Sequence, residues 1–267
     1  MIIGTKEFDV KNRTYIMGIL NVTPDSFSDG GKYNQFDSAL KHIDNMITDG
    51  ADIIDVGGES TKPGFQKISD DEEIERVVPV IEAIKKNFDI PISLDTYKSQ
   101  VALEGIKAGA DLINDIWGLK YDEKMASVIA QNNVSCCLMH NRENINYTSF
   151  MKDVIMDLEE SINIAQNSGI SKDRIILDPG VGFAKTYDMN LEVIRKLEQL
   201  HILGLPILLG TSRKSVIGLT LNLPSDQRLE GTLSTTVIGI IKGCSFVRVH
   251  DVLENSRVIK MTEAILR

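Results

Sequence analysis

The stretch YIMGILNVTPDSFSDGG, residues 15–31, decides the fold of this chain. Its apolar run from Ile16 to Leu20 is bounded by turn residues, which predicts a short buried strand. The strand ends on Asn21 and opens into a loop rich in hydroxyl and carboxyl groups that closes on a pair of glycines. A buried strand followed by a long polar loop is how many barrel enzymes position their chemistry.

Seven further units of this kind follow along the chain. The predicted main strands are short and rich in Ile, Leu and Val, and they cover residues 16–20, 51–56, 92–95, 112–116, 134–139, 174–177, 206–209 and 246–249. Predicted helices cover residues 37–49, 70–87, 98–108, 123–131, 149–167, 190–200, 229–242 and 255–266. Strands that do not alternate suit a parallel sheet buried on both faces. Eight such units predict an α/β fold, a (β/α)8 TIM barrel forming a single domain over residues 1–267.

The loops separate this barrel from an open doubly wound sheet, which is the alternative. Helix-to-strand connections are short, as at Asp49-Gly50, whereas strand-to-helix loops such as 22–35 and 57–70 are long. In a barrel these long loops share the face where active sites lie. No GxGxxG motif follows the first strand, so a dinucleotide site has no support. Ahead of the barrel, residues 2–14 predict a β-hairpin with strands at 2–3 and 8–10, whose apolar residues are expected to cover the barrel bottom.

Composition excludes several classes of partner. The formal net charge of −9 argues against nucleic acid and against an anionic membrane surface. No apolar run is long enough for a transmembrane helix, and no signal peptide is expected. The three cysteines show neither metal-ligand spacing nor a disulfide framework, so we expect reduced thiols in a cytoplasmic protein.

Every predicted strand ends in polar residues, which are Asn21, Asp55, Asp95, Asn114 with Asp115, His140, Asp178, Ser212 with Lys214, and Arg248 with His250. Helix capping alone does not readily account for eight such ends. For Asp55 and Asp115 a structural role is as good an interpretation as a functional one. Asp95, Asn114 and Asp178 are better candidates for ligand contact. Buried carboxylates need donors, and a flat nitrogen heterocycle with ring N–H groups supplies them. A sugar phosphate stays an alternative at this point, because sugar hydroxyls also bind carboxylates.

A second group of strand-end and loop residues supplies positive charge and hydroxyl groups: Lys214, Arg248, His250, Ser60 and Thr61. This group suits a phosphate or diphosphate. Asn21 and Asp25 offer oxygens of the kind that Mg²⁺ takes when it also binds phosphate. A heterocycle at one end and a metal-bound diphosphate at the other describe a group-transfer substrate with a pyrophosphate leaving group.

These motifs resemble one known family along essentially the whole chain. NVTPDSFSDGG (21–31) and DVGGESTKPG (55–64) are similar to the first two signatures of the dihydropteroate synthases, a pterin-binding enzyme family. The remaining strand-end motifs follow in the family's order: LDT (94–96), IND (113–115), LMH (138–140), DPGVGFAKT (178–186), TSRK (211–214) and RVHD (248–251).

The resemblance implies a barrel, usually a homodimer, that joins 6-hydroxymethyl-7,8-dihydropterin diphosphate to 4-aminobenzoate with Mg²⁺. The products are 7,8-dihydropteroate and pyrophosphate, in folate biosynthesis, and such enzymes are sulfonamide targets. A pterin-binding methyltransferase and a non-catalytic pterin-binding barrel are the alternatives. The methyltransferase would not need Lys214, Arg248 and His250 grouped with a long loop rich in Asp and Ser.

The resemblance also assigns site residues. The pterin ligands would be Asp95, Asn114, Asp178 and Lys214, with Met139 at the ring edge. The diphosphate would contact Thr61, Arg248 and His250, and Asn21 would bind Mg²⁺. The aminobenzoate would be surrounded by Phe27, Pro63, Phe183, Ser212 and Lys214. Position 62 departs from the family pattern, because Lys62 stands where Arg is more frequent and lacks the bidentate geometry of Arg.

We expect the reaction to begin with cleavage of the C–O bond to diphosphate, which leaves a cation delocalised into the pterin ring. Arg248, His250, Lys62 and Mg²⁺ would stabilise the departing diphosphate. Asp95 and Asp178 would stabilise the positive ring. The neutral arylamine then attacks, and Asp29 in the first loop is a further candidate for shielding the cation. The residues expected to act in catalysis are therefore Asp95, Lys214, Arg248 and Asp29.

Overall fold

The computed structural model describes residues 1–22, 32–59 and 67–266. Its main sheet has eight parallel strands in the spatial order β8-β7-β6-β5-β4-β3-β10-β9. They are β3 (Tyr15–Asn21), β4 (Ile53–Gly57), β5 (Ile92–Asp95), β6 (Leu112–Asp115), β7 (Ser135–Met139), β8 (Ile175–Asp178), β9 (Leu208–Leu209) and β10 (Phe246–Val249). A parallel bridge between Leu177 and Ile207 joins the two ends of this order, so the sheet closes and the predicted barrel is confirmed.

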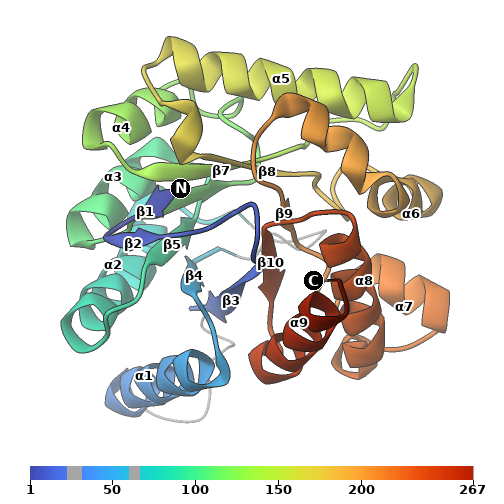
Figure 1. Cartoon of the computed structure of the whole chain (residues 1–267). Coiled ribbons are helices and arrows are strands. Elements are labelled where there is room, and N and C mark those ends of the chain that lie inside the picture. The colour runs from blue at the N-terminus through green and yellow to red at the C-terminus, as the bar shows by residue number, and fades with distance from the viewer. Residues whose placement is uncertain (23–31, 60–66, 267) are drawn as a thin grey trace.

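Figure 1 shows the helices arranged around these strands. They are α1 (Lys32–Asp49), α2 (Asp70–Asn87), α3 (Ser99–Ala108), α4 (Met125–Asn132), α5 (Phe150–Asn167), α6 (Tyr187–Arg195), α7 (Ser215–Leu221), α8 (Leu229–Ile241) and α9 (Val252–Leu266). Three short 3-10 helices complete the described part of the chain: η2 (Lys172–Arg174), η3 (Leu197–Leu203) and η4 (Ser225–Gln227). No helix in the described ranges is long and apolar enough to cross a membrane.

Local signals explain why α2 begins and ends where the sequence predicts. Ser69 caps its first turn, because the Ser69 hydroxyl accepts a hydrogen bond from the Glu72 amide at 3.2 Å. Acidic residues follow in the first turn and two lysines stand in the last, which suits the helix dipole. The helix buries Val77, Ile81 and Ile84 against the barrel.

Two predicted elements differ from the structure, and one helix was not predicted. The expected helix 190–200 is α6 followed by η3, because helical geometry breaks at Lys196, where φ is −108°. Helix α7 was not predicted, since seven residues without a side-chain cap carry too little periodicity. In the hairpin, β1 (Ile2–Ile3) pairs with β2 (Lys6–Glu7), so placing the second strand at 8–10 was wrong by two residues.

The hairpin nevertheless seals the barrel as expected. Ile3 and Phe8 are buried in an apolar floor cluster with inward residues of seven barrel strands, which are Tyr15, Met17, Ile53, Leu112, Cys137, Ile176, Leu208 and Phe246. Cys137 belongs to this floor, whereas Cys136 belongs to the outer core between the sheet and the helices. The two cysteines therefore face opposite sides of β7, as strand geometry requires.

The floor offers a matched pair of variants, because Ile3 is fully buried while the neighbouring Ile2 is 54% exposed. We expect Ile3→Ala to lower the free energy of unfolding by about 2–5 kcal/mol, since it leaves a cavity in the floor. Ile2→Ala should change it by less than about 0.5 kcal/mol. Urea titrations of both variants and the parent measure this, and equal losses would show that the hairpin does not seal the barrel.

Candidate functional site

Four acidic or amide side chains and one arginine converge at the carboxyl ends of the strands: Asp55, Asp95, Asn114, Asp178 and Arg248. Alternate residues of a strand face the same side, and Phe246 faces the barrel interior, so Arg248 does too. The parallel register places Gly57 beside Asp95, and Asp95 beside Asn114. The structure therefore brings these predicted residues together at the mouth of the barrel.

Arg248 bridges two carboxylates in this mouth. Its Nε donates to Asp55 Oδ2 at 2.5 Å, and its Nη2 donates to Asp95 Oδ2 at 2.6 Å. Asp55 is fully buried and also accepts from the Ser93 hydroxyl and, at 3.4 Å, from the Asn114 amide. Asp55, for which sequence left the role open, is thus the anchor of Arg248. Burial acts to lower the pKa of Arg248, but Asp55 and Asp95 outweigh it and raise that pKa.

One carboxylate oxygen of Asp95 accepts no hydrogen bond from the described part of the protein. Among the described residues, its buried Oδ1 is the side-chain oxygen that lacks a hydrogen-bond partner. Burial raises the pKa of Asp95 to about 7, with Asp55 adding to the rise and Arg248 opposing it. A buried acceptor without a donor at a strand end is a place where a ligand N–H group fits.

Asp178 and Lys214 form the opposite side of the mouth. Asp178 Oδ1 accepts from the Gly180 amide at 2.7 Å. The Lys214 ammonium donates to the Val181 carbonyl and stands 4.9 Å from the centre of the Phe183 ring. Burial lowers the pKa of Lys214 to about 8, although Asp178 acts to raise it. Burial raises the pKa of Asp178, and Lys214 opposes that shift.

Ser212 and His250 pair at the edge of this group. The Ser212 hydroxyl lies 2.9 Å from His250 Nδ1, and the His250 amide donates to the same hydroxyl at 3.2 Å. Arg213, next to Ser212, instead forms an ion pair with Asp251. The edge of the mouth therefore presents a hydroxyl and an imidazole.

An apolar wall lies beside the polar groups. Met139 is buried with Tyr97 and Ile116, and Trp117 and Phe183 pack against them. A flat apolar wall next to a few convergent polar groups is typical of a pocket for an aromatic heterocycle. The apolar wall and the polar groups therefore indicate the same kind of ligand, an aromatic heterocycle.

The other strand-end candidates have different places. Asp115 accepts from the Trp117 amide at 2.8 Å and from the Leu119 amide at 2.7 Å, and Leu119 has a φ of +70°. Asp115 thus closes a turn, which is a structural role, one of the two interpretations that the sequence allowed. The His140 ring lies between Asp157 and Lys185, at 2.9 Å and 2.8 Å. Sequence reasoning missed Lys185, although it lies inside the DPGVGFAKT motif.

Sequence reasoning also missed a buried ion cluster at the base of the second long loop. Lys98 Nζ donates to Glu59 Oε2 at 2.8 Å, to Glu73 Oε2 at 2.7 Å and to the Ile68 carbonyl at 2.8 Å. Burial acts to raise the pKa of Glu59, but hydrogen bonds from Lys98, Tyr97 and Ile68 outweigh it and lower that pKa. The cluster ties Glu59 and Ile68, which stand on either side of residues 60–66 in the sequence, to the start of α3. The sequence shows charged residues at helix starts and strand ends, but it does not show which of them will pair in the folded protein.

Seven candidates lie outside the described residues: Asp25, Phe27, Asp29, Ser60, Thr61, Lys62 and Pro63. Within the described ranges, no group of three or more His, Cys, Asp or Glu side chains could hold a metal. Asn21 is exposed at the end of β3, and a Cβ on Gly57 would lie 3.8 Å from its Oδ1. A lone side-chain oxygen at a strand end fits Mg²⁺, which binds proteins through few side-chain oxygens and completes its shell with substrate phosphate and water.

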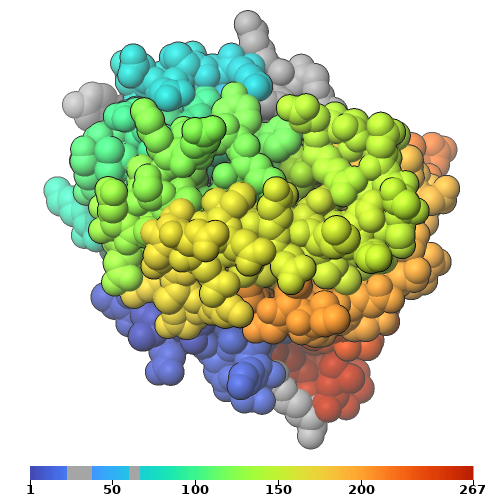
Figure 2. Space-filling model, turned by 90° about the horizontal axis from the view of Figure 1, so that it is seen from above, coloured from blue at the N-terminus to red at the C-terminus, as the bar shows by residue number. Residues whose placement is uncertain are grey.

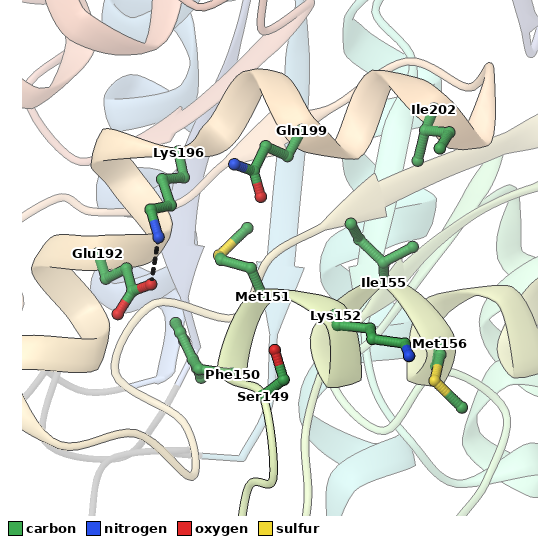
Figure 3. A pocket seen from close by; sticks show the side chains of 10 residues that line it. All are labelled: Ser149, Phe150, Met151, Lys152, Ile155, Met156, Glu192, Lys196, Gln199 and Ile202. Carbon is green, nitrogen blue, oxygen red and sulfur yellow. Dashed lines mark hydrogen bonds and ion pairs between the residues drawn. The ribbon is translucent and has the colours of Figure 1, made fainter.

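A separate cavity lies on the side of the molecule that α5 crosses, which Figure 2 shows in yellow-green and yellow. It measures about 520 Å³ and lies between α5 and the α6–η3 segment (Figure 3). Its lining includes Met151, Ile155 and the Glu192–Lys196 ion pair. None of the strand-end residues lines this cavity, so the chemistry of the mouth does not extend into it.

The closed barrel and its mouth define a class of protein: an α/β barrel whose mouth presents carboxylates, an amide and a lysine, which are groups that suit a flat nitrogen heterocycle. Comparison with known proteins gives the family. Residues 17–250 match the family described as pterin binding enzyme, and the chain belongs to this family. Membership sets the sugar-phosphate alternative aside.

Curated relatives and solved structures agree with this family. The chain is 64% identical to the dihydropteroate synthase of Clostridium beijerinckii, over all of both chains. A dihydropteroate synthase of Clostridium difficile, solved in the presence of pteroic acid, is 53% identical with a TM-score of 0.95, covering 98% of this chain and 100% of that one. A Yersinia pestis dihydropteroate synthase in a sulfonamide drug complex is 40% identical with a TM-score of 0.93, covering 100% and 98%.

The raised pKa of Asp95 leads to a prediction about stability. The pKa rises from 3.8 to about 7 on folding, so between these values the folded state binds more protons than the unfolded state. Stability therefore falls as pH rises through this window, and Asp95→Asn removes that part of the fall. We expect urea titrations from about pH 4 to about pH 7 to show the variant gaining stability relative to the parent.

Asp89→Asn is the matched control, because the Asp89 side chain is 92% exposed. It should stay at a constant difference from the parent across the same range. A difference for Asp95→Asn that is equally constant would mean that burial does not raise the pKa of Asp95.

Proposed function

We propose that this chain is a dihydropteroate synthase, which joins 6-hydroxymethyl-7,8-dihydropterin diphosphate to 4-aminobenzoate and releases pyrophosphate. The observation that carries the proposal is the unpartnered Oδ1 of Asp95 in a mouth that also holds Asn114, Asp178 and Lys214. Similarity over the full length to dihydropteroate synthases supports it. All of residues 1–267 would act as one domain, and the cytoplasm would keep its three free thiols reduced.

The pterin would lie in the mouth with its edge toward the acidic groups. Asp95 and Asp178 accept hydrogen bonds from the amino and ring N–H groups, and Asn114 and Lys214 bind the remaining polar edge. Met139 lies against the ring. Asp55, Asp95 and Asp178 are three carboxylates against the two cations Arg248 and Lys214. When all are ionised the mouth carries excess negative charge, which stabilises a cation spread over the pterin ring.

The leaving diphosphate would lie at the edge formed by Ser212 and His250. Arg248 uses Nε and Nη2 for carboxylates, so its remaining N–H groups reach the diphosphate. Asn21, with Asp25, would hold Mg²⁺, which supplies positive charge that weakens the C–O bond. Thr61 and Lys62 join this group, and Asp29 shields the cation, as the family resemblance implies.

The acceptor would enter beside Phe183 and Ser212, with Phe27 and Pro63 completing its surroundings. Its neutral amine nitrogen attacks the methylene carbon, so that a C–N bond forms after the C–O bond breaks. The proton leaves the nitrogen once the new bond has formed. Pteroic acid, present with the Clostridium difficile relative, contains a pterin joined to aminobenzoate, which supports this pair of substrates.

The test is pyrophosphate release from dihydropterin diphosphate with Mg²⁺, with and without 4-aminobenzoate. We expect release that depends on the amine and equals the dihydropteroate formed. Asp95→Asn should lower kcat/KM for the pterin substrate at least roughly tenfold, because it removes hydrogen bonds to a charged acceptor. Omitting Mg²⁺ with a chelator present should suppress release, and restoring the metal should recover it.

Other outcomes point elsewhere. Pterin binding without any release would favour a pterin-binding methyltransferase or a non-catalytic pterin-binding barrel. Those two differ in whether a methyl donor is consumed. Release that does not need the amine would keep early C–O cleavage and leave the acceptor open. An unchanged rate for Asp95→Asn would refute its electrostatic role.

The assembly would be a homodimer through one apolar surface. Helices α7, α8 and α9 lie side by side (Figure 1), and α7 contacts α8, which contacts α9. Their exposed large apolar residues form the α7–α9 surface: Leu219, Leu221, Ile238, Ile241, Met261, Ile265 and Leu266. An apolar surface of this extent is unusual on a monomer, which supports burial against a second copy.

Sedimentation measures this directly. The parent should have the mass of a dimer, and Ile241→Glu should shift it toward a monomer, because a charge would be buried in the interface. Ile202→Glu is the control, since Ile202 is 78% exposed on η3, outside the α7–α9 surface. A monomeric parent would contradict the dimer.

A further inference from the structure

We infer that Lys185, held by His140 and Asp157, is a positioning residue that sets the loop between β8 and α6 and thereby the affinity for the 4-aminobenzoate acceptor. The inference rests on the proposed function, because Phe183 in this loop is proposed to border the acceptor. Within the described residues, the hydrogen bonds of Lys185 go to His140 and to two backbone carbonyls, and none goes to a proposed substrate-binding side chain. Its effect would pass through residues 180–184.

Burial lowers the pKa of Lys185 to about 7, and in its protonated form the ammonium uses all three of its protons inside the protein. It lies 2.8 Å from His140 Nδ1, donates to the Gly180 carbonyl at 2.9 Å and donates to the Phe183 carbonyl at 3.1 Å. Two of these acceptors belong to the loop that follows β8. The third belongs to the end of β7. One ammonium group therefore ties two neighbouring strand ends and the loop together.

His140 is held in turn from the other side. Its Nε2 lies 2.9 Å from Asp157 on α5, which also accepts from Arg142 Nε at 2.5 Å. Burial lowers the pKa of His140 to about 4, so the ring is neutral near pH 7. A neutral ring that donates to Asp157 through Nε2 leaves Nδ1 free to accept from Lys185. Asp157, His140 and Lys185 thus form a chain with one consistent direction of donation.

The loop needs this support because its backbone is unusual. Gly180 has a φ of +68°, Gly182 of +87° and Ala184 of +43°. Ala184 pays a steric cost for such a φ that glycine does not. A Cβ on Gly180 would lie 2.0 Å from the His140 carbonyl oxygen, so the loop packs directly on the end of β7. Tyr147 and Asn190 add hydrogen bonds to Ala184 O and Gly182 N at 2.9 Å and 2.6 Å.

What this loop holds in place is Lys214. The Val181 carbonyl accepts from the Lys214 ammonium, and the Phe183 ring lies beneath it. A Cβ on Gly182 would lie 3.3 Å from Lys214 Cδ, so the lysine stem rests on the loop. Lys185 bonds the carbonyls of residues 180 and 183, which flank these contacts. A loosened loop would therefore displace the Phe183 ring and the partner of Lys214 together, while Asp95 and Asn114 on other strands stay in place.

The experiment compares Lys185→Met with Lys196→Met, a lysine that pairs with Glu192 at 2.7 Å outside this loop. For Lys185→Met we expect KM for 4-aminobenzoate to rise at least about tenfold. We expect KM for the pterin substrate to rise by less than about threefold, because Lys214 loses one carbonyl partner while Asp95 and Asn114 keep their places, and kcat to change by no more than that. Hydrogen exchange followed by mass spectrometry should be faster over residues 179–186 and unchanged elsewhere. Lys196→Met should match the parent in every measurement.

Each other outcome counts against the inference. Faster exchange in the loop with unchanged KM for 4-aminobenzoate would leave Lys185 a purely structural residue. Equal losses in both substrates would do the same. If Lys185→Met does not fold, Asp157→Asn replaces it in the experiment. We then expect KM for 4-aminobenzoate to rise about threefold, because this variant weakens the hydrogen-bonded chain of Asp157, His140 and Lys185 at the end away from the loop. If the parent shows no turnover the proposed function fails, and exchange in residues 179–186 alone then decides whether Lys185 holds the loop.

Discussion

The placing of Arg248 between Asp55 and Asp95 is the interaction on which this site depends. Two carboxylates buried side by side at a strand end would repel each other, and each would lose its hydration. The Arg248 guanidinium donates a hydrogen bond to each carboxylate, which offsets their repulsion and their lost hydration. It leaves Asp95 Oδ1 without a partner among the described residues. The pairing exists because barrel closure sets β10 beside β3, which leaves it two strands from Asp55 on β4 and three strands from Asp95 on β5. Closure of the sheet therefore also determines which charged groups meet in the mouth.

The interior of the barrel divides into two layers along its axis. The lower layer is the apolar floor that Ile3 and Phe8 seal, and the upper layer is the polar mouth. A single strand contributes to both, as β10 does with Phe246 below and Arg248 above. The floor supplies burial of apolar surface, which stabilises the fold, and the mouth holds groups whose burial costs stability. This separation lets the mouth carry unsatisfied and unusually titrating groups without endangering the fold.

Buried lysines fasten the loops around the mouth. Lys98 joins Glu59 and Ile68 to the start of α3, and Lys185 joins the loop after β8 to the end of β7. In both cases every proton of the ammonium has an acceptor. A buried cation with saturated hydrogen bonds fixes geometry more strictly than apolar packing, because a small shift leaves a charged group unpaired.

The sequence by itself determined the class of fold, the face that carries the chemistry and most of the residues there. Repeated short apolar runs, each ending in polar residues, suffice for this, because strand period and loop length are local properties. The predicted bounds of helix α2, which has its own caps, agree with the structure at both ends. The short uncapped α7 was not predicted, and the second hairpin strand was placed wrongly. Only the tertiary structure decided the partners. Arg248 meets Asp55 across 193 positions, and Lys185 meets His140 across 45. Such pairs arise when the sheet closes and burial makes each charge seek its nearest neighbour, and no local pattern in the chain records that neighbour.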